Sequence, residues 1–332
     1  MTFESDILQK ATENEKRVRS FTAASTLPWK LLKNDGCVID GKIKPVHLQI
    51  SPTNRCNANC SWCSCSEVDR TQELPIDEII RIFGEFEILG ARAVTITGGG
   101  EPTIHPDIQR ILYGAAECGF NIGMVTNGLL WGKKGADVGS ANNLLTWLRV
   151  STVEPSGKPQ VDRVKTICER LPDVDVGISF TVPADVNIAA AVALCEIVDG
   201  LPNLTHIRFV QDILYPDSSE SAMTSVRLRC RDITDKAIFQ SRNVFTKGHN
   251  PCWISKLKPY VDANGYVFAC CGFQYAHPDS LRKLNHKFSM CHWSWFYNTS
   301  AFDGSVCQKC YYNSYNLLLD NMVTPLEHQN FV

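Results

Sequence analysis

The 332-residue chain lacks the features that would place it in a membrane, outside the cell or on nucleic acid. No apolar run approaches the ~20 residues that a membrane-spanning helix needs. Residues 1–6 contain no basic start followed by an apolar stretch, so we expect no secretory signal and a cytoplasmic protein. The formal net charge is only −2, which leaves no strong electrostatic footprint for nucleic acid.

Intrinsic disorder and internal repetition are equally absent. Hydrophobic residues make up 44% of the chain and charged residues 20%, and both values are ordinary for a globular protein that buries a core. Against this ordinary background stand fifteen cysteines, an odd number. Because no secretory signal is expected, a framework of disulfides is not expected either, and the thiols indicate metal binding or redox chemistry.

From residue 45 onward, short runs rich in β-branched residues alternate with helical periods. Alternation of this kind predicts parallel strands joined by right-handed crossover helices. Pattern alone does not separate a partial or full barrel from a doubly wound sheet. The strands are expected at 46–51, 93–97, 121–126, 147–152, 174–182 and 205–211, and the helices at 76–89, 106–118, 140–146, 160–170 and 187–199.

The chain on either side of this region has a different character. Residues 1–44 are expected to form a short N-terminal extension with an amphipathic helix that Asp6 caps. We expect a barrel-like unit over 45–215 and a bridging segment over 216–250, loop-like at its start and then mixed and helical in part. Residues 251–332 are aromatic and rich in cysteine, with a helix at 313–323, and are predicted to form a small second domain that relies on a metal.

The first cysteine-rich motif directly follows the first expected strand. Cys56, Cys60 and Cys63 have the spacing C-x3-C-x2-C. Three thiolates in one short loop suit an iron–sulfur cluster, and with only three of them one iron is left open. A zinc loop is the alternative, with Cys65 as its fourth ligand.

A glycine run follows the second expected strand at the same end of the sheet. The sequence there is Thr-Gly-Gly-Gly-Glu-Pro over residues 97–102. Glycines at the end of a strand allow a ligand to approach the backbone closely. The exposed carbonyls and Glu101 are predicted to accept hydrogen bonds from an ammonium group.

With both motifs in place, residues 45–211 resemble the radical S-adenosylmethionine (radical SAM) superfamily. The C-x3-C-x-aromatic-C loop, the Gly-Gly-Glu-Pro segment and the Thr-Asn-Gly that ends the third strand all match this family. The resemblance implies an α/β fold, a partial (β/α)6 barrel of the TIM type. It also implies a 4Fe-4S cluster whose open iron is chelated by the amino and carboxylate groups of SAM. Reductive cleavage of SAM would then yield a 5′-deoxyadenosyl radical that abstracts hydrogen from a substrate.

The resemblance carries over to individual positions. Ser151 ends the fourth strand, where the family often places a polar SAM contact, although the usual acidic residue two positions on is replaced by Val153, with Glu154 next. For Arg208, a contact with SAM or substrate competes with an ion pair at the barrel mouth. The cluster ligands are expected to be Cys56, Cys60 and Cys63, and the SAM contacts Trp62, Gly99, Gly100, Glu101, Pro102, Thr126, Asn127, Ser151, Asn187 and Arg208.

A second cysteine-rich constellation lies in the C-terminal region. Alternating apolar residues around Asn264-Gly265 predict a β-hairpin that brings Cys252 and Cys270 together, and Cys307 and Cys310 form a C-x2-C knuckle. The four thiolates would close one site, for which a zinc ribbon is the alternative. The arrangement resembles the SPASM/Twitch domains of radical SAM enzymes and implies a second 4Fe-4S cluster. Alternative ligands are Cys271 and Cys291.

The sequence contains no motif that identifies the substrate. We expect a radical SAM enzyme acting on a small biosynthetic molecule, such as a sugar, aminocyclitol or nucleoside, with flavodoxin or ferredoxin as electron donor. The second cluster would suit a two-electron oxidation. Modification of a peptide or protein side chain is one alternative, which the short N-terminal extension disfavours. A non-catalytic protein that binds zinc is an alternative from a different class.

Overall fold

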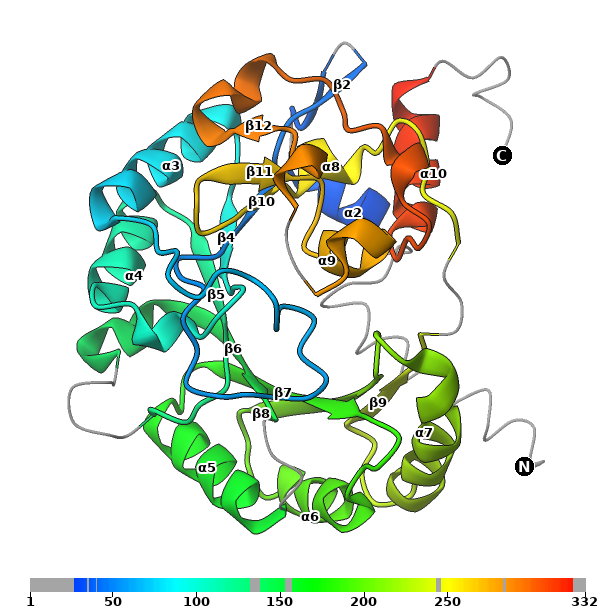
Figure 1. The fold of residues 1–332 in the computed structure, drawn as a ribbon. Helices are drawn as coiled ribbons and strands as arrows, with labels where there is room; N and C mark the ends of the chain where they lie inside the picture. Colours follow the sequence, from blue (N-terminus) through cyan, green and yellow to red (C-terminus); the bar gives the residue numbers. More distant parts are fainter. Residues whose placement is uncertain are drawn as a thin grey trace.

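The computed structural model describes residues 27–34, 36–39, 41–131, 138–152, 157–242, 246–282 and 285–324. The helix expected after Asp6, together with Val153 and Glu154, lies outside these residues. Within them, the chain forms one large curved sheet whose outer side is covered by helices (Figure 1). None of the helices in the described ranges is both long enough and apolar enough to cross a lipid bilayer.

The centre of the sheet is a run of parallel strands in chain order, which confirms the α/β partial barrel. All six expected strands are present within a few residues of their expected bounds. In the large sheet the described strands follow the order β12-β11-β10-β3-β4-β5-β6-β7-β8-β9. The parallel strands are β3 (His47–Ile50), β4 (Ala93–Ile96), β5 (Asn121–Thr126), β6 (Leu145–Ser151), β7 (Asp175–Val182), β8 (Leu204–Gln211) and β9 (Ala237–Gln240).

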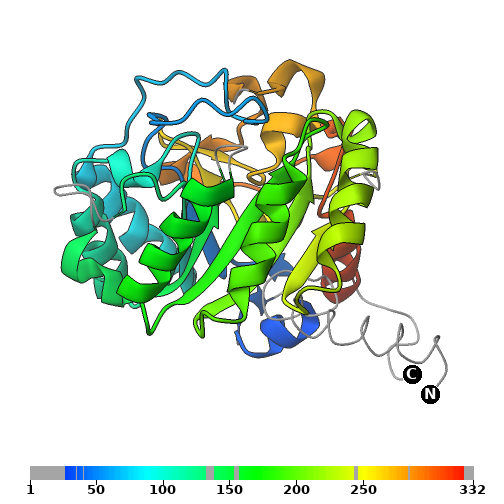
Figure 2. The same cartoon turned by 90° about the horizontal axis from the view of Figure 1, so that it is seen from below.

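The helices form an outer layer, which Figure 2 shows on the near side of the sheet. In α3 (Ile76–Leu89), buried residues recur every three or four positions, at Ile79, Ile82, Phe83 and Phe86, and so form one apolar face against the strands. Next along the chain come η2 (Pro102–Ile104), α4 (Ile108–Glu117), η3 (Gly139–Leu144), α5 (Gly157–Arg170), α6 (Ile188–Val198) and α7 (Pro216–Cys230). Where a helix was expected at 140–146, the structure has the short 3-10 element η3, and β6 already begins at Leu145.

The segment after residue 215 differs from its expected form. It begins with helix rather than loop, since Pro216 occupies the first turn of α7, where its missing N–H costs nothing. Ala222, Met223 and Val226 bury the inner face of this helix against the sheet. The chain then adds β9 beside β8, where Phe239 stacks on Phe209, so the barrel has one parallel strand more than the sequence predicted.

The cysteine-rich C-terminal region extends the barrel sheet. The expected hairpin is present, and Gly265 (φ +78°) supplies its turn in the left-handed region. Its first strand also pairs in parallel with β3, which makes the hairpin a continuation of the large sheet. The elements are α8 (Ile254–Leu257), β10 (Tyr260–Val261), β11 (Tyr266–Phe268), α9 (Phe273–Ala276), η4 (Pro278–Ser280), η5 (His286–Phe288), β12 (Cys291–His292), η6 (Trp293–Asn298), η7 (Gly304–Val306) and α10 (Asn313–Val323).

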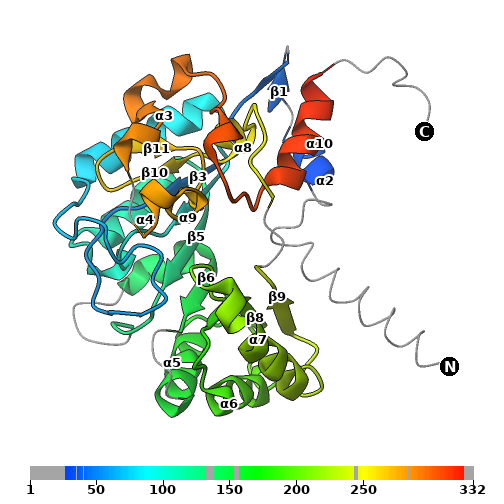
Figure 3. The same cartoon turned by 45° about the vertical axis from the view of Figure 1, so that its right-hand side comes forward.

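The segments that precede and follow the barrel in the sequence pack together in a second apolar cluster. Figure 3 shows α2 (Leu27–Leu32) beside α10. Leu27, Leu31 and Leu319 are buried there together with Ile254 and Leu257 of α8. The short hairpin of β1 (Val38–Ile39) and β2 (Lys42–Ile43) connects α2 to β3. The N-terminal and C-terminal segments therefore stabilise each other at the β3 side of the barrel.

Candidate active site

The three-cysteine loop lies between β3 and α3, at the carboxyl end of the parallel strands. Figure 2 shows it as a blue trace along one end of the barrel. Cys56 is exposed, whereas Cys60 and Cys63 are half-buried. The Cys63 N–H donates to the Cys60 carbonyl at 3.1 Å, and the Cys65 N–H lies 3.4 Å from the Cys63 Sγ. The turn therefore directs at least one main-chain donor toward a ligand sulfur.

The thiols of this loop are mutually close. Burial raises the pKa of Cys56, and the Cys63 thiol raises it further. Burial, together with the thiols of Cys63 and Cys56, raises the pKa of Cys60 to about 11. Deprotonating such a group of thiols is unfavourable unless a cation compensates their charge, and metal binding does so with release of the protons. The donor set therefore suits an iron–sulfur cluster with three protein ligands.

The glycine run after β4 packs directly against the start of this loop. A Cβ at Gly98 would lie 2.8 Å from the Ser51 Oγ, and one at Gly100 would overlap the Arg55 carbonyl oxygen. The Gly99 N–H donates to Ser51 Oγ at 3.0 Å, and the Gly99 carbonyl accepts from Arg70 Nη1 at 2.9 Å. The absence of a Cβ at these glycines accommodates the chain's own residues 54–55, and close approach of a ligand to their backbone stays a prediction. The two motifs are thus parts of one packed unit.

Glu101 is buried, and both of its carboxylate oxygens are engaged. Oε1 accepts from the Thr103 N–H and Oγ1 and from Thr126 Oγ1, and Oε2 accepts from the Asn127 N–H at 2.6 Å. Burial raises the pKa of Glu101, and these hydrogen bonds oppose that shift. Glu101 therefore positions the glycine run against the end of β5. An ammonium contact by its carboxylate or by the neighbouring carbonyls stays a prediction.

The end of β5 reaches the cysteine loop through Asn127. Its Nδ2 donates to Asn57 Oδ1 at 2.7 Å and lies 4.0 Å from the Cys56 Sγ. Thr126 is tied to the same region through Glu101, and Pro102 begins the buried turn η2. Asn57 and Arg70 were missed by the sequence analysis, because neither belongs to a spacing pattern.

Enlarging Gly100 should damage this packed unit. In Gly100→Ala the new methyl group overlaps main-chain atoms that cannot rotate away, so we expect a loss of about 1–3 kcal/mol in the free energy of unfolding. The cysteine loop should shift with it, which lowers SAM cleavage. Denaturant unfolding and 5′-deoxyadenosine formation measure both effects.

The matched control is Gly84→Ala in α3, where a Cβ meets no atom within 4 Å. This change should stabilise the helix by roughly 0.5–1 kcal/mol and leave cleavage intact. Wild-type stability and cleavage in Gly100→Ala would show that the contact between the two motifs has no importance.

A pocket opens beside the cysteine loop toward β6 and β7. Its empty volume, open mouth included, is about 630 Å³, and Cys60, Trp62, Thr152 and Asn187 are among its lining residues. Pockets of this size hold small ligands and cofactors. Asn187 also caps α6 by accepting the Ala190 N–H at 3.1 Å. The structure thus brings Trp62 and Asn187 together.

The other eight predicted SAM contacts lie outside that lining, Ser151 and Arg208 among them. Ser151 precedes the lining residue Thr152 and pairs in register with Ser179 of β7. Arg208 lies opposite Ser179 on β8 and donates to its Oγ at 3.3 Å. Among the described residues Arg208 joins no ion pair, which removes support for the alternative of an ion pair at the barrel mouth.

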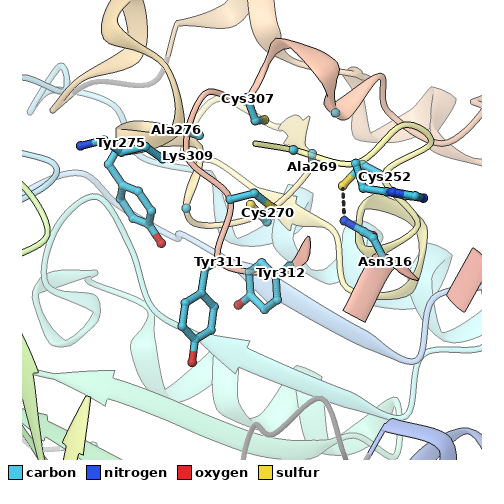
Figure 4. A pocket seen from close by; sticks show the side chains of 15 residues that line it. Cys252, Ala269, Cys270, Tyr275, Ala276, Cys307, Lys309, Tyr311, Tyr312 and Asn316 are labelled. Carbon is cyan, nitrogen blue, oxygen red and sulfur yellow. Dashed lines mark hydrogen bonds between the residues drawn. The ribbon is translucent and has the colours of Figure 1, made fainter. Parts of the chain in front are cut away.

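The four C-terminal cysteines proposed as one set line a single pocket. Figure 4 shows Cys252, Cys270 and Cys307 around it, with Tyr311 and Tyr312 beside it. Cys310 completes the set, and the empty volume is about 410 Å³ with the open mouth included. Hydrogen bonds hold the segments together: Gly248 N–H to the Cys307 carbonyl at 2.9 Å and Cys310 N–H to the Thr246 carbonyl at 2.7 Å.

The electrostatics of this pocket also group the four thiols. Burial and the Cys310 thiol raise the pKa of Cys252 to about 11. Burial, together with the thiols of Cys252 and Cys310, raises the pKa of Cys307 to about 12. The pKa of Cys270 is also raised, by burial and by the neighbouring thiols of Cys271, Cys252 and Cys307. The buried Asn316 directs its Nδ2 at Cys252 Sγ, 3.6 Å away. Such N–H···S contacts are typical outer partners of cluster ligands.

The described cysteine side chains are not arranged around one common point. In the part of the chain that the structure describes, no three or more His, Cys, Asp or Glu side chains surround a position for one metal ion. The alternatives Cys271 and Cys291 do not line the four-cysteine pocket.

Comparison with known proteins places these motifs in a family. Residues 50–146 match the family model of the radical SAM superfamily. The GTP 3′,8-cyclase of Staphylococcus saprophyticus is 28% identical over 159 residues, which are 44% of this chain and 46% of that protein. The mitochondrial GTP 3′,8-cyclase of Arabidopsis thaliana is 37% identical over 94 residues, 26% of this chain and 24% of that protein. The match spans half or less of the length of these relatives.

Solved structures show the same fold. The structure "Native anSMEcpe with bound AdoMet and Kp18Cys peptide" has a TM-score of 0.56 at 12% identity, covering 82% of this chain and 88% of that one. Streptococcus suis SuiB bound to precursor peptide SuiA has a TM-score of 0.53 at 16% identity, covering 81% and 67%. The segment that matches the radical SAM superfamily model begins at the last residue of β3 and contains both the three-cysteine loop and the glycine run.

Proposed function

We propose that this chain is a radical SAM enzyme that abstracts hydrogen from a small biosynthetic molecule bound in the barrel. One observation carries the proposal. The three-cysteine loop, the glycine run and the end of β5 form one hydrogen-bonded unit beside a pocket large enough for a cofactor. A 4Fe-4S cluster held there by Cys56, Cys60 and Cys63 would supply the electron that cleaves bound SAM.

The chain's own residues would position the cofactor and shield it. Glu101 fixes the glycine run against β5, and Asn127 fixes the cysteine loop against the same strand end. Trp62 and Asn187 both line the pocket, where we propose that SAM binds. Ser151 and Arg208 lie deeper on the strands and stay candidate contacts to SAM or substrate. We propose flavodoxin or ferredoxin as the electron donor.

The four-cysteine pocket supports an auxiliary 4Fe-4S cluster as part of the proposal. Its ligands would be Cys252, Cys270, Cys307 and Cys310, with Asn316 as donor to one sulfur. Tyr311 and Tyr312 lie on its border. A cluster in that place could accept an electron from a substrate radical and thereby complete a two-electron oxidation.

We favour a small-molecule substrate, nucleosides included, because Ser151, Ser179 and Arg208 place polar groups side by side on β6, β7 and β8. The relatives named GTP 3′,8-cyclase are consistent with a nucleoside-containing substrate, although the match covers half or less of their length. Modification of a peptide is the alternative, and the structures of that kind share the fold at 12–16% identity.

Deuterium tracing tests the proposal. The reduced, reconstituted enzyme is incubated with SAM and deuterated candidate pools of nucleosides, sugars, aminocyclitols and peptides. We expect deuterium in 5′-deoxyadenosine with one of the small-molecule pools. Label that appears only with a peptide pool would replace the proposal by its alternative, and cleavage of SAM without label from any small molecule would contradict it.

A further inference from the structure

Three arginines lie together on or beside the strands of the barrel. Arg149 is on β6, Arg208 is on β8, and Arg242 follows β9. Leu148 and Val150 on β6 point into the apolar core beneath the helices. Because side chains alternate along a strand, Arg149 between them faces the barrel interior.

The same alternation places Arg208 inside, since its neighbours Ile207 and Phe209 belong to the apolar core. The three guanidinium groups are close enough to repel one another. Burial and the charges of Arg149 and Arg242 lower the pKa of Arg208 to about 9. Burial also lowers the pKa of Arg149, the Cys271 thiol and the Tyr312 hydroxyl oppose that shift, and Arg242 adds to it. The half-buried Lys258 and His206 add further basic groups to this interior.

Few partners compensate these charges. The Nε atoms of Arg149, Arg208 and Arg242 are buried and have no hydrogen-bond partner among the described residues, and neither has Nη1 of Arg242. Arg208 donates to the neutral Ser179 Oγ. Arg149 and Arg242 lie over the rings of Trp147 and Tyr311, at 5.9 Å and 4.8 Å from the ring centroids. No ion pair within the described ranges involves any of the three.

The three side chains are partly buried, and burying a cation without a partner of opposite charge is costly unless a ligand supplies that charge. Guanidinium groups present paired donors that match the oxygens of a phosphate or carboxylate. We propose that Arg149, Arg208 and Arg242 bind an oxyanion group of the substrate, a phosphate or a carboxylate, inside the barrel. The term substrate rests on the proposed function, whereas binding of the anion does not.

The position suits this role. Arg149 lies two residues before Ser151 on the same face of β6, about 7 Å deeper in the barrel. Arg242 stacks on Tyr311, which borders the four-cysteine pocket. A substrate anchored by its anionic group would therefore lie between the proposed SAM pocket and the auxiliary site.

Binding of simple anions to the reconstituted protein tests the proposal. Inorganic triphosphate represents the phosphate source, and citrate represents the carboxylate source. Each is titrated by calorimetry in a series of buffers, and the ionic strength is held constant within each titration. We expect saturable binding of at least one of them that weakens as salt is added. Arg149→Gln and Arg208→Gln should each weaken it about tenfold or more, since each removes a charged hydrogen-bond donor. The control Arg229→Gln, on the exposed side of α7, should bind as the wild type does.

Thermal unfolding of the same variants separates ligand binding from a structural role. Without anion, Arg208→Gln should melt no lower than the wild type, because a buried charge without a partner is removed. With anion, only the wild type and Arg229→Gln should gain stability. Absence of saturable binding for both anions, equal binding in the arginine variants, or loss of iron from Arg208→Gln would overturn the proposal. Anion binding in a protein that does not cleave SAM would overturn the proposed function alone.

Discussion

Cys60→Ala should abolish the reductive cleavage of SAM while the barrel stays folded. Cys60 lies in the loop between β3 and α3, its thiol is half-buried, and the thiols of Cys63 and Cys56 raise its pKa. Without it, two thiolates are left for a cluster that needs three from this loop. The loss should exceed the roughly 10- to 100-fold effect typical of losing an outer partner of a metal ligand.

Chromatographic detection of 5′-deoxyadenosine after anaerobic reconstitution and reduction measures this effect. Far-ultraviolet circular dichroism checks that the barrel remains folded. Cys118→Ala is the matched control, because Cys118 is half-buried at the end of α4 and does not line either pocket. It should retain cleavage. Cleavage that persists in Cys60→Ala would show that the site has been assigned to the wrong residues.

The double variant Cys252→Ala/Cys307→Ala should lose the auxiliary cluster. Iron should fall from about eight to about four per chain, since one of two 4Fe-4S clusters is removed. The midpoint of thermal unfolding should also fall, because metal binding contributes to folding free energy. The elements around the four-cysteine pocket pack against β3 and α2, so α2 should be destabilised too.

Iron analysis, electron paramagnetic resonance of the reduced protein and thermal unfolding follow these changes. Cleavage of SAM at the first cluster should survive in part. Cys291→Ala is the control, because Cys291 is half-buried in β12 outside the four-cysteine pocket. It should keep about eight irons. Unchanged iron in the double variant, or loss in Cys291→Ala, would contradict the ligand assignment.

Local patterns predicted most of the barrel. Short β-rich runs predict the six parallel strands, and a helical period of apolar residues predicts α3. Tertiary contacts do not override these local preferences. The first turns of α7 contain Pro216 and a run of polar residues, so the sequence suggested a loop. The helix buries only one side, and its apolar pattern is therefore weak. The pairing of β10 with β3 was missed because they are more than 200 residues apart in the chain. No local signal encodes such a contact.

The candidate site divides in the same way. Cysteines are found from spacing, and the four-cysteine set is brought together in the structure as the hairpin and knuckle predicted. Contacts that depend on tertiary hydrogen bonds and close packing could not be read from residue spacing. Glu101 holds the chain together at four donors, and the glycines accommodate residues 54–55. Arg149 and Arg242 carry no motif, and only closure of the barrel shows that they lie beside Arg208.

Anaerobic reconstitution of the wild-type chain with iron and sulfide, followed by reduction in the presence of SAM, tests the central claim most directly. We expect a brown protein with about eight irons per chain that forms methionine and 5′-deoxyadenosine. A colourless protein that binds zinc and leaves SAM intact would contradict the claim.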